Sequence, residues 1–380
     1  MNFLTPQNLF SLHYFDGNQK KFWLGFLFYI FILVFSYLFF YFFEVYSLFP
    51  SERNLVNWDA QWYEIIKNKG YEYYWYMASD SAFFPLFPYL WKLLHFNSIG
   101  ISLFNLLLFG ISVSLLVKHF LFEVPKVLMY ISLPSCVFFF LPYSESLFFF
   151  FSTLFLIGLK SGNTKLIVLG LFFCSLTRAT AMFFIPSIIL MEVFSSEKFL
   201  DKKSLLNIVL YSVIAILGLA AVVIFQYSQT YTWFAFAKQQ INFWGHYFRW
   251  PGFPLVSHGG EKILWIDSLA FLSGIFGFLF LLIFFIKKLF GAKSSLFNNK
   301  PFWFATSYIF MVTVYSLFFN FKCLNAQTSI DSINRYVFST AFSFVFILTA
   351  INYYKISLKN FIYFLFVFVF VYIFFGIGGQ

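Results

Sequence analysis

The chain has 380 residues, of which 61% are hydrophobic and only 11% are charged. One soluble core cannot hide that much apolar surface, so the composition argues against a soluble globular protein and indicates a polytopic helical membrane protein. The formal net charge is +10, but the lysines lie in short segments between apolar runs and form no basic stripe, so we expect no nucleic-acid partner.

Apolar runs predict an all-α fold with about eleven spans in one domain that takes in residues 1–380. Several runs are shorter than the roughly 20 helical residues that a bilayer requires. Prolines at positions 134, 142 and 186 therefore predict broken or re-entrant helices between 127 and 194. The predicted spans are 22–43, 101–117, 127–141, 146–159, 166–178, 180–194, 205–227, 263–286, 302–319, 335–352 and 361–377.

Lysine placement predicts the orientation of these spans. The run that follows Lys20 and Lys21 is too long for a signal peptide, so we expect a retained first span. If these two lysines are cytoplasmic, alternation places the other lysine-rich junctions on the same side. The larger segments 44–100, 228–262 and 320–334 then lie outside, and we expect amphipathic surface helices in the first of them.

The arginines follow a different rule. All of them fall on the predicted outer side, whereas every predicted cytoplasmic cation is a lysine. Cations are disfavoured on the outer side, so retention of a planar guanidinium there suggests bidentate recognition of phosphate or carboxylate. The alternative is that these side chains snorkel or cap helices at the interface. They are Arg53, Arg178, Arg249 and Arg335.

The segment 57–71 is the most informative part of the first outer segment. Its spacing predicts a helix that places Asp59, Tyr63 and Ile66 on one side and ends at Gly70. A carboxylate held among aromatic rings beside lipid suits a general base. The alternative is an interfacial helix whose aromatic residues only set its depth in the membrane.

This segment reads Trp-Asp-Ala-x-x-Tyr-x-x-Ile-x-x-x-Gly-Tyr and is followed by Ala-Phe-Phe-Pro-Leu-x-Pro at 82–88. The pattern resembles the first outer loop of the PIG-V family. This family comprises GPI mannosyltransferase 2-like enzymes of the GT-C superfamily, which use polyprenyl-phosphate sugars. Three shorter segments resemble the same family in the same order. They are Tyr143-Ser144-Glu145-Ser146, Thr177-Arg178 and Arg335-Tyr336.

The resemblance implies a GT-C fold and an inverting hexosyltransferase, most simply a mannosyltransferase. Asp59 would be the general base, and Arg178 and Arg335 would bind the donor phosphate. The implied partners are a polyprenyl-phosphate-linked sugar donor, an acceptor hydroxyl on a glycan, glycolipid or protein, and membrane lipids. A bacterial-type enzyme of the inner (cytoplasmic) membrane, with an extracytoplasmic active site and no obligate protein partner, is expected.

Other residues are candidates for substrate binding. Trp58 and Tyr63 suit stacking on a sugar, although lipid anchoring is the alternative for the tryptophans of this helix. Glu145 is expected to orient Arg178 or bind a sugar hydroxyl, with a structural hydrogen bond as the alternative. The remaining candidates are Tyr143, Gln240, Trp244, Arg249 and Tyr336. The second outer segment departs from the family pattern, because His246 stands where an arginine is usual and the glutamine spacing differs.

No metal or cofactor is expected, because arginine pairing can offset the charge of a leaving phosphate. A divalent cation held by Asp59, Glu64 and Asp80 is a weaker alternative. The three cysteines are widely spaced and support no disulfide framework. A multispan transporter or flippase for a lipid-linked sugar or small anion is the alternative function, but the expected ionisable residues deep within spans are missing from the pattern.

Overall fold

The computed structural model of the protein describes residues 17–45, 51–196, 201–257, 261–320 and 327–355. Within these residues the chain is almost entirely helical, which confirms the predicted all-α polytopic class. Five described helices are long and apolar enough to cross a membrane. They are α2 (Gly17–Phe42), α6 (Ser98–Phe120), α11 (Lys202–Thr230), α13 (Glu261–Leu289) and α14 (Lys300–Phe318).

Shorter helices fill the centre of the bundle and connect the long ones. These are α7 (Val124–Ile131), α8 (Glu145–Ser161), α9 (Thr164–Thr177), α10 (Phe184–Ser195), α15 (Ile333–Phe338) and α16 (Ala341–Tyr353). The 3-10 turns η2 (Pro134–Phe139) and η3 (Ala179–Phe183) lie between short helices, and η4 (Ser295–Asn298) lies between the long helices α13 and α14. The predicted span 361–377 lies outside the described residues.

Breaks in the short helices follow from local sequence. The predicted span 127–141 is interrupted, because the residue before Pro134 is driven out of the helical region; Leu133 has φ −60° and ψ 135°. The break confirms the expectation for this part of the chain. A second break was not predicted. It divides the expected span 335–352 into α15 and α16. Thr340 caps α16 by accepting a hydrogen bond from Ser343 N.

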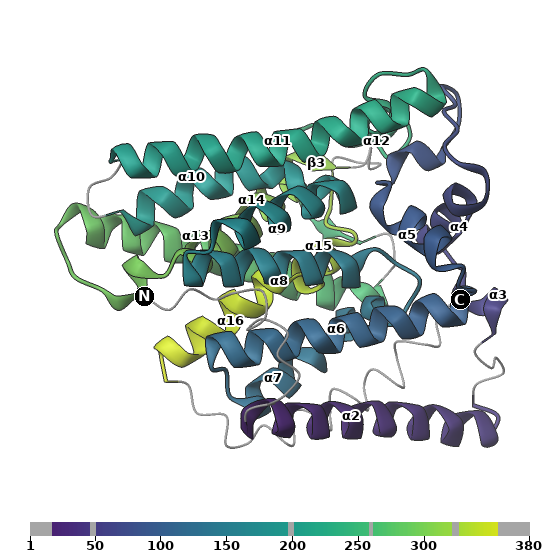
Figure 1. The fold of residues 1–380 in the computed structure, drawn as a ribbon, viewed down its shortest axis with the longest axis horizontal. Coiled ribbons are helices and arrows are strands. Elements are labelled where there is room, and N and C mark those ends of the chain that lie inside the picture. Colours follow the sequence, from purple (N-terminus) through teal and green to yellow (C-terminus); the bar gives the residue numbers. More distant parts are fainter. Residues whose placement is uncertain (1–16, 46–50, 197–200, 258–260, 321–326, 356–380) are drawn as a thin grey trace.

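The three segments predicted to lie outside, which keep the names first, second and third outer segment, carry small elements that gather at one end of the bundle, at the right of Figure 1. These are α3 (Glu52–Leu55), α4 (Asp59–Lys69), η1 (Asp80–Ala82), α5 (Leu86–Leu94) and α12 (Ala235–Asn242). Two short pairings then join the second outer segment to the third: β1 (Tyr247–Phe248) pairs antiparallel with β3 (Phe319–Asn320), and β2 (Leu255–Val256) pairs parallel with β4 (Thr328–Ser329).

The two ends of the bundle differ in their cations. At one end Lys160 Nζ donates to His119 O at 2.6 Å, and Lys300 Nζ lies 2.6 Å from Glu192 Oε1. At the other end Arg178 and Arg335 meet the same carboxylate. We call these the lysine end and the arginine end. Lysines occur at the arginine end too, on α4, α5 and α12, so the two names mark only where Arg178 and Arg335 lie.

The core lies where α8 meets α6, α9 and α16, and it is built largely of aromatic side chains. Helices α8 and α9 pack closely because Gly170 has no side chain; a Cβ there would lie 2.6 Å from Phe155 N. This contact fixes the relative positions of Glu145 at the start of α8 and Arg178 just after α9.

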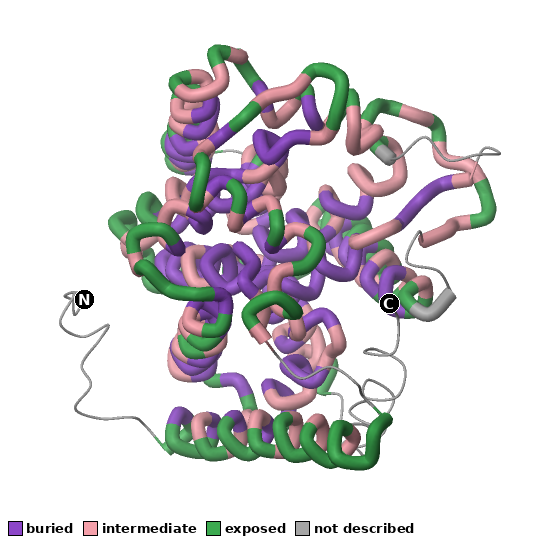
Figure 2. Tube along the Cα trace, turned by 90° about the vertical axis from the view of Figure 1, so that its right-hand side faces the viewer, coloured by how far each residue is buried: buried purple, intermediate pink, exposed green. Residues whose placement is uncertain are grey.

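Helix α2 runs along the bottom of both views, and most of its turns are exposed (Figure 2), as expected of a lipid-facing helix.

Candidate active site

Arg335 is the centre of an ionic cluster at the arginine end. Its Nε donates to Glu145 Oε1 and its Nη1 donates to Asp59 Oδ2. The three residues come from α15, α8 and α4, so the pairings tie the first outer segment to the helix bundle. The predicted base and one predicted phosphate ligand are therefore in direct contact.

Arg178 completes the cluster from the other side of the shared carboxylate. Its Nη1 lies 2.8 Å from Glu145 Oε1, and the Glu145 side chain is 0% exposed. An unpaired buried carboxylate is costly, so two arginines around Glu145 explain how it is tolerated there. Glu145 therefore contacts Arg178, which fits both the expected orienting role and the structural alternative. We define the ionic cluster as Asp59, Glu145, Arg178 and Arg335; its two acids and two arginines have a formal net charge of zero.

Aromatic rings pack against both guanidinium groups. The Arg335 Cζ lies 4.7 Å from the ring centroid of Tyr143, and the Arg178 Cζ lies 5.5 Å from that of Tyr336. Stacking on a ring stabilises the cation and restricts the orientation of its planar fork. The rings of Tyr143 and Tyr336, predicted to bind substrate, thus contact the arginines in this structure.

Helix α4 is held against the bundle by two tyrosines as well as by Asp59. The Tyr63 and Ser144 hydroxyls lie 2.8 Å apart, and the Tyr143 hydroxyl donates to Asn57 O at 3.1 Å. Burial raises the pKa of the Tyr63 hydroxyl, and the nearby negative charge of Glu145 raises it further. Tyr63 therefore stays protonated. Its ring and Ile66 form the buried face predicted for this helix.

Solvent or substrate can reach Asp59, a member of the ionic cluster, and Trp58, the residue that precedes it. The Asp59 side chain is 23% exposed, whereas the Arg335 side chain is 11% exposed. Trp58 is 71% exposed and adopts a left-handed φ of 49° immediately before α4. The carboxylate thus lies at the outer edge of the cluster, next to an exposed indole ring.

The second outer segment approaches this edge through Trp244. The Trp244 ring lies edge-on to Phe83 at 6.3 Å, and Phe83 in turn lies edge-on to Tyr63 at 5.3 Å. Gln240 is half-buried, and its carbonyl accepts a hydrogen bond from His246 N at 2.9 Å. Arg249 follows β1, and its backbone N–H donates to Phe318 O at 2.6 Å. Gln240 and Arg249, both predicted to bind substrate, make these backbone contacts within the described structure and are not members of the ionic cluster.

Sequence reasoning missed three glutamines that hold the first outer segment. Gln239, which is 0% exposed, donates to Tyr74 O at 2.6 Å and accepts from Ser79 N at 3.3 Å. Gln226 donates to Ser81 O at 2.8 Å, and Gln229 accepts from Tyr71 N at 2.8 Å. We call Gln226, Gln229 and Gln239 the glutamine clamp. Gln226 and Gln229 lie three positions apart at the end of the apolar helix α11, and this spacing could have identified them from the sequence.

A second missed contact positions Arg335. Asp267, which is 0% exposed on α13, accepts hydrogen bonds from the backbone N of Asn334 at 3.0 Å and from its Nδ2 at 2.5 Å. The Asn334 Oδ1 accepts from Ser135 Oγ at 2.9 Å. Asn334 therefore joins α13, α15 and η2 immediately before Arg335. An acid inside an apolar run was the signal that could have identified Asp267.

Asp80 has a structural contact of its own. Its Oδ1 accepts from Glu72 N at 2.9 Å, and burial raises the pKa of its carboxyl to about 7. Among the described residues, no group of three or more histidine, cysteine or acidic side chains could hold a metal ion. The alternative cation site of Asp59, Glu64 and Asp80 is not assembled in the described structure.

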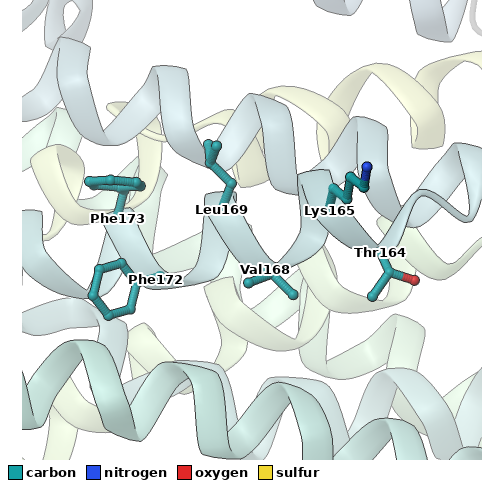
Figure 3. A pocket seen from close by; sticks show the side chains of 6 residues that line it. All are labelled: Thr164, Lys165, Val168, Leu169, Phe172 and Phe173. Carbon is teal, nitrogen blue, oxygen red and sulfur yellow. The ribbon is translucent and has the colours of Figure 1, made fainter. Parts of the chain in front are cut away.

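A shallow apolar groove lies elsewhere, along α9 (Figure 3). Its volume is about 410 Å³. The lining residues are Thr164, Lys165, Val168, Leu169, Phe172 and Phe173. None of these residues belongs to the ionic cluster, so the groove is separate from the candidate active site.

Comparison with known proteins adds no further constraint: no family model, no curated protein and no solved structure matches the chain.

Proposed function

We propose that the protein is an integral-membrane glycosyltransferase of the GT-C type. It would transfer a hexose, most simply mannose, from a polyprenyl phosphate to an acceptor hydroxyl, with inversion. The observation that carries this proposal is the ionic cluster, in which one partly exposed carboxylate and two buried arginines meet at one end of an apolar bundle. The proposed location is a bacterial inner membrane, with the arginine end on the extracytoplasmic side.

In the proposed reaction, Asp59 accepts the proton of the acceptor hydroxyl. The acceptor oxygen forms a bond to the anomeric carbon as the bond from that carbon to the phosphate oxygen breaks. The leaving phosphate takes the electron pair. General-base assistance of this kind contributes roughly 10²–10⁴-fold to a rate.

The ionic cluster must rearrange for this step, because Asp59 is paired with Arg335 in the described structure. Arg335 has a second partner in Glu145, so it does not become an unpaired buried cation when Asp59 turns toward the acceptor. Arg335 and Arg178 would then offset the charge that develops on the leaving phosphate, as guanidinium groups do in other phosphate sites.

The test is transfer from radiolabelled polyprenyl-phosphate sugars by purified protein, with mannose and glucose donors compared. Asp59→Asn is expected to lower kcat by roughly 10²–10⁴-fold, and Arg178→Lys and Arg335→Lys are expected to raise KM for the donor. If the Asp59→Asn variant kept the turnover of the wild type, Asp59 would not be the general base. Movement of a lipid-linked sugar across proteoliposomes without any transfer would favour the transporter alternative.

A further inference from the structure

Tyr308 is a buried polar residue that the proposed mechanism does not use. Its side chain lies on α14, is 0% exposed, and packs against the rings of Phe184 at 6.0 Å and Phe342 at 4.5 Å. Among the described residues its hydroxyl makes no hydrogen bond of good geometry. Buried hydroxyl groups are normally hydrogen-bonded, and one without a partner calls for an explanation.

The Tyr308 hydroxyl lies beside two other donors that are poorly used. Thr180 in η3 has a buried Oγ1 that also makes no hydrogen bond of acceptable geometry. Arg178 Nη1 is close to Glu145 Oε1 but is not aligned for a hydrogen bond. The Tyr308 hydroxyl lies within hydrogen-bonding reach of the Thr180 hydroxyl, and the charge of Arg178 also acts on it. Even if the two hydroxyls turned toward each other, only one of their two O–H groups would be used, so at least one donor would remain.

The Tyr308 hydroxyl, the Thr180 hydroxyl and Arg178 Nη1 can each donate a hydrogen bond to an oxygen, although only the arginine is charged. The positive charges of Arg178 and Arg335 are shared with Asp59 and Glu145, so they offset only part of the negative charge of a phosphate that enters the site. Neutral hydroxyl donors stabilise such an oxygen without adding another charge. A tetrahedral oxyanion with several acceptor oxygens suits a set of donors on η3, α14 and the residue before η3.

We propose that Tyr308 and Thr180, together with Arg178, form an oxyanion subsite for the phosphate of a polyprenyl phosphate. This subsite rests on the proposed function for the identity of the lipid, and it adds two hydroxyl groups to the residues that bind the donor. Tyr308 and Thr180 are substrate-binding residues in this proposal. They take no part in the proton transfer.

The experiment measures binding and thermal stability of purified protein with decaprenyl phosphate as the probe. Tyr308→Phe removes only the hydroxyl. It is expected to leave the melting temperature of the ligand-free protein unchanged or higher, because an unpartnered buried hydroxyl is lost. The Kd for decaprenyl phosphate is expected to rise about tenfold or more, the value of one charge-assisted hydrogen bond. Thr180→Val is expected to act in the same direction.

Tyr130→Phe is the matched control. Tyr130 is also buried, but its hydroxyl donates to Phe338 O at 2.6 Å. The control variant is therefore expected to lower the melting temperature and leave the Kd unchanged. Decaprenol, which lacks the phosphate, and inorganic phosphate, which lacks the chain, show which part of the probe binds. The Tyr308 effect is expected with decaprenyl phosphate and absent with decaprenol.

Three outcomes would overturn the subsite: no binding of decaprenyl phosphate by the wild type, an unchanged Kd in Tyr308→Phe, or an equal loss of affinity for decaprenol. The proposed function is judged separately, by sugar transfer. If the wild type binds decaprenyl phosphate through Tyr308 but transfers no sugar, the subsite stands and the transferase proposal fails. If transfer occurs and Tyr308→Phe keeps the wild-type donor KM, only the subsite fails.

Discussion

Arg335 and Asp59 form an ion pair although 276 positions separate them in the chain. Arg335 also donates to Glu145, which in turn lies against Arg178. This arrangement makes Arg335 the residue through which the first outer segment, α8 and α15 are joined. Loss of its guanidinium would leave two carboxylates without their shared partner.

Arg335→Gln is therefore expected to lower the free energy of unfolding by about 3–5 kcal/mol, the usual cost of breaking a buried ion pair on one side. Thermal unfolding in detergent measures the effect. Arg53→Gln is the control, because Arg53 is exposed on α3 and its removal is expected to change the stability little. Equal melting temperatures for the two variants would show that the cluster does not stabilise the fold.

Asp59→Asn is expected to separate catalysis from folding. Asn keeps the size of the side chain, and Arg335 keeps its bond to Glu145, so the melting temperature should stay close to that of the wild type. Sugar transfer should fall by roughly 10²–10⁴-fold. Glu64→Gln, on the same helix, is the matched control and should retain its activity. Parallel losses of activity and of melting temperature in Asp59→Asn would instead indicate a structural role.

The glutamine clamp predicts different effects for two adjacent residues. Gln239→Ala removes hydrogen bonds to the backbone of residues 74–79 and leaves buried groups unpaired, at a cost of about 1–3 kcal/mol for each. We expect faster limited proteolysis between residues 71 and 82. Gln240→Ala, the neighbouring substitution, should leave the cleavage rate unchanged. Similar rates for both variants would argue against the clamp.

Asp80 predicts a pH dependence of the same segment. Burial raises the pKa of its carboxyl to about 7, so from roughly pH 4 to pH 7 the folded state holds a proton that the unfolded state releases. The stability from this group is present at low pH and is lost as the pH rises through 7. Asp80→Asn should flatten the loss of stability, and the matching increase in unfolding or cleavage rates, between roughly pH 4 and pH 7. A free energy of unfolding that rises with pH over this range, or a decrease that the substitution leaves unchanged, would contradict this assignment.

Asp267 and Arg335 are expected to be energetically coupled. Asp267 fixes Asn334, and Asn334 precedes the arginine that enters the ionic cluster. A double-mutant cycle with Asp267→Asn and Arg335→Gln should show a coupling free energy of about 0.5–3 kcal/mol in thermal or chemical unfolding. Asp331→Asn is the comparison, because Asp331 accepts from Ser257 Oγ at 3.1 Å and, within the described part of the chain, forms no hydrogen bond with Asn334. Additive effects of Asp267→Asn and Arg335→Gln would show that Asp267 does not position the arginine.

Much of the helical framework followed from the sequence alone. Long apolar runs predicted α2, α6, α11, α13 and α14, because a chain with so little charge must bury its backbone polar groups in helices within lipid. Gly70 correctly marked the end of α4, since its φ of 85° is readily reached only by glycine.

The ionic cluster depended on tertiary structure. Sequence reasoning nominated Asp59, Glu145, Arg178 and Arg335, but periodicity records only which face of a helix is apolar. It does not record which distant residue that face will meet, so the sequence could not show that Arg335 bonds to both acids. The same limit explains why Gln240 was nominated and the buried Gln239 was missed: adjacent residues on α12 point in different directions, and only helix packing decides which amide reaches the first outer segment.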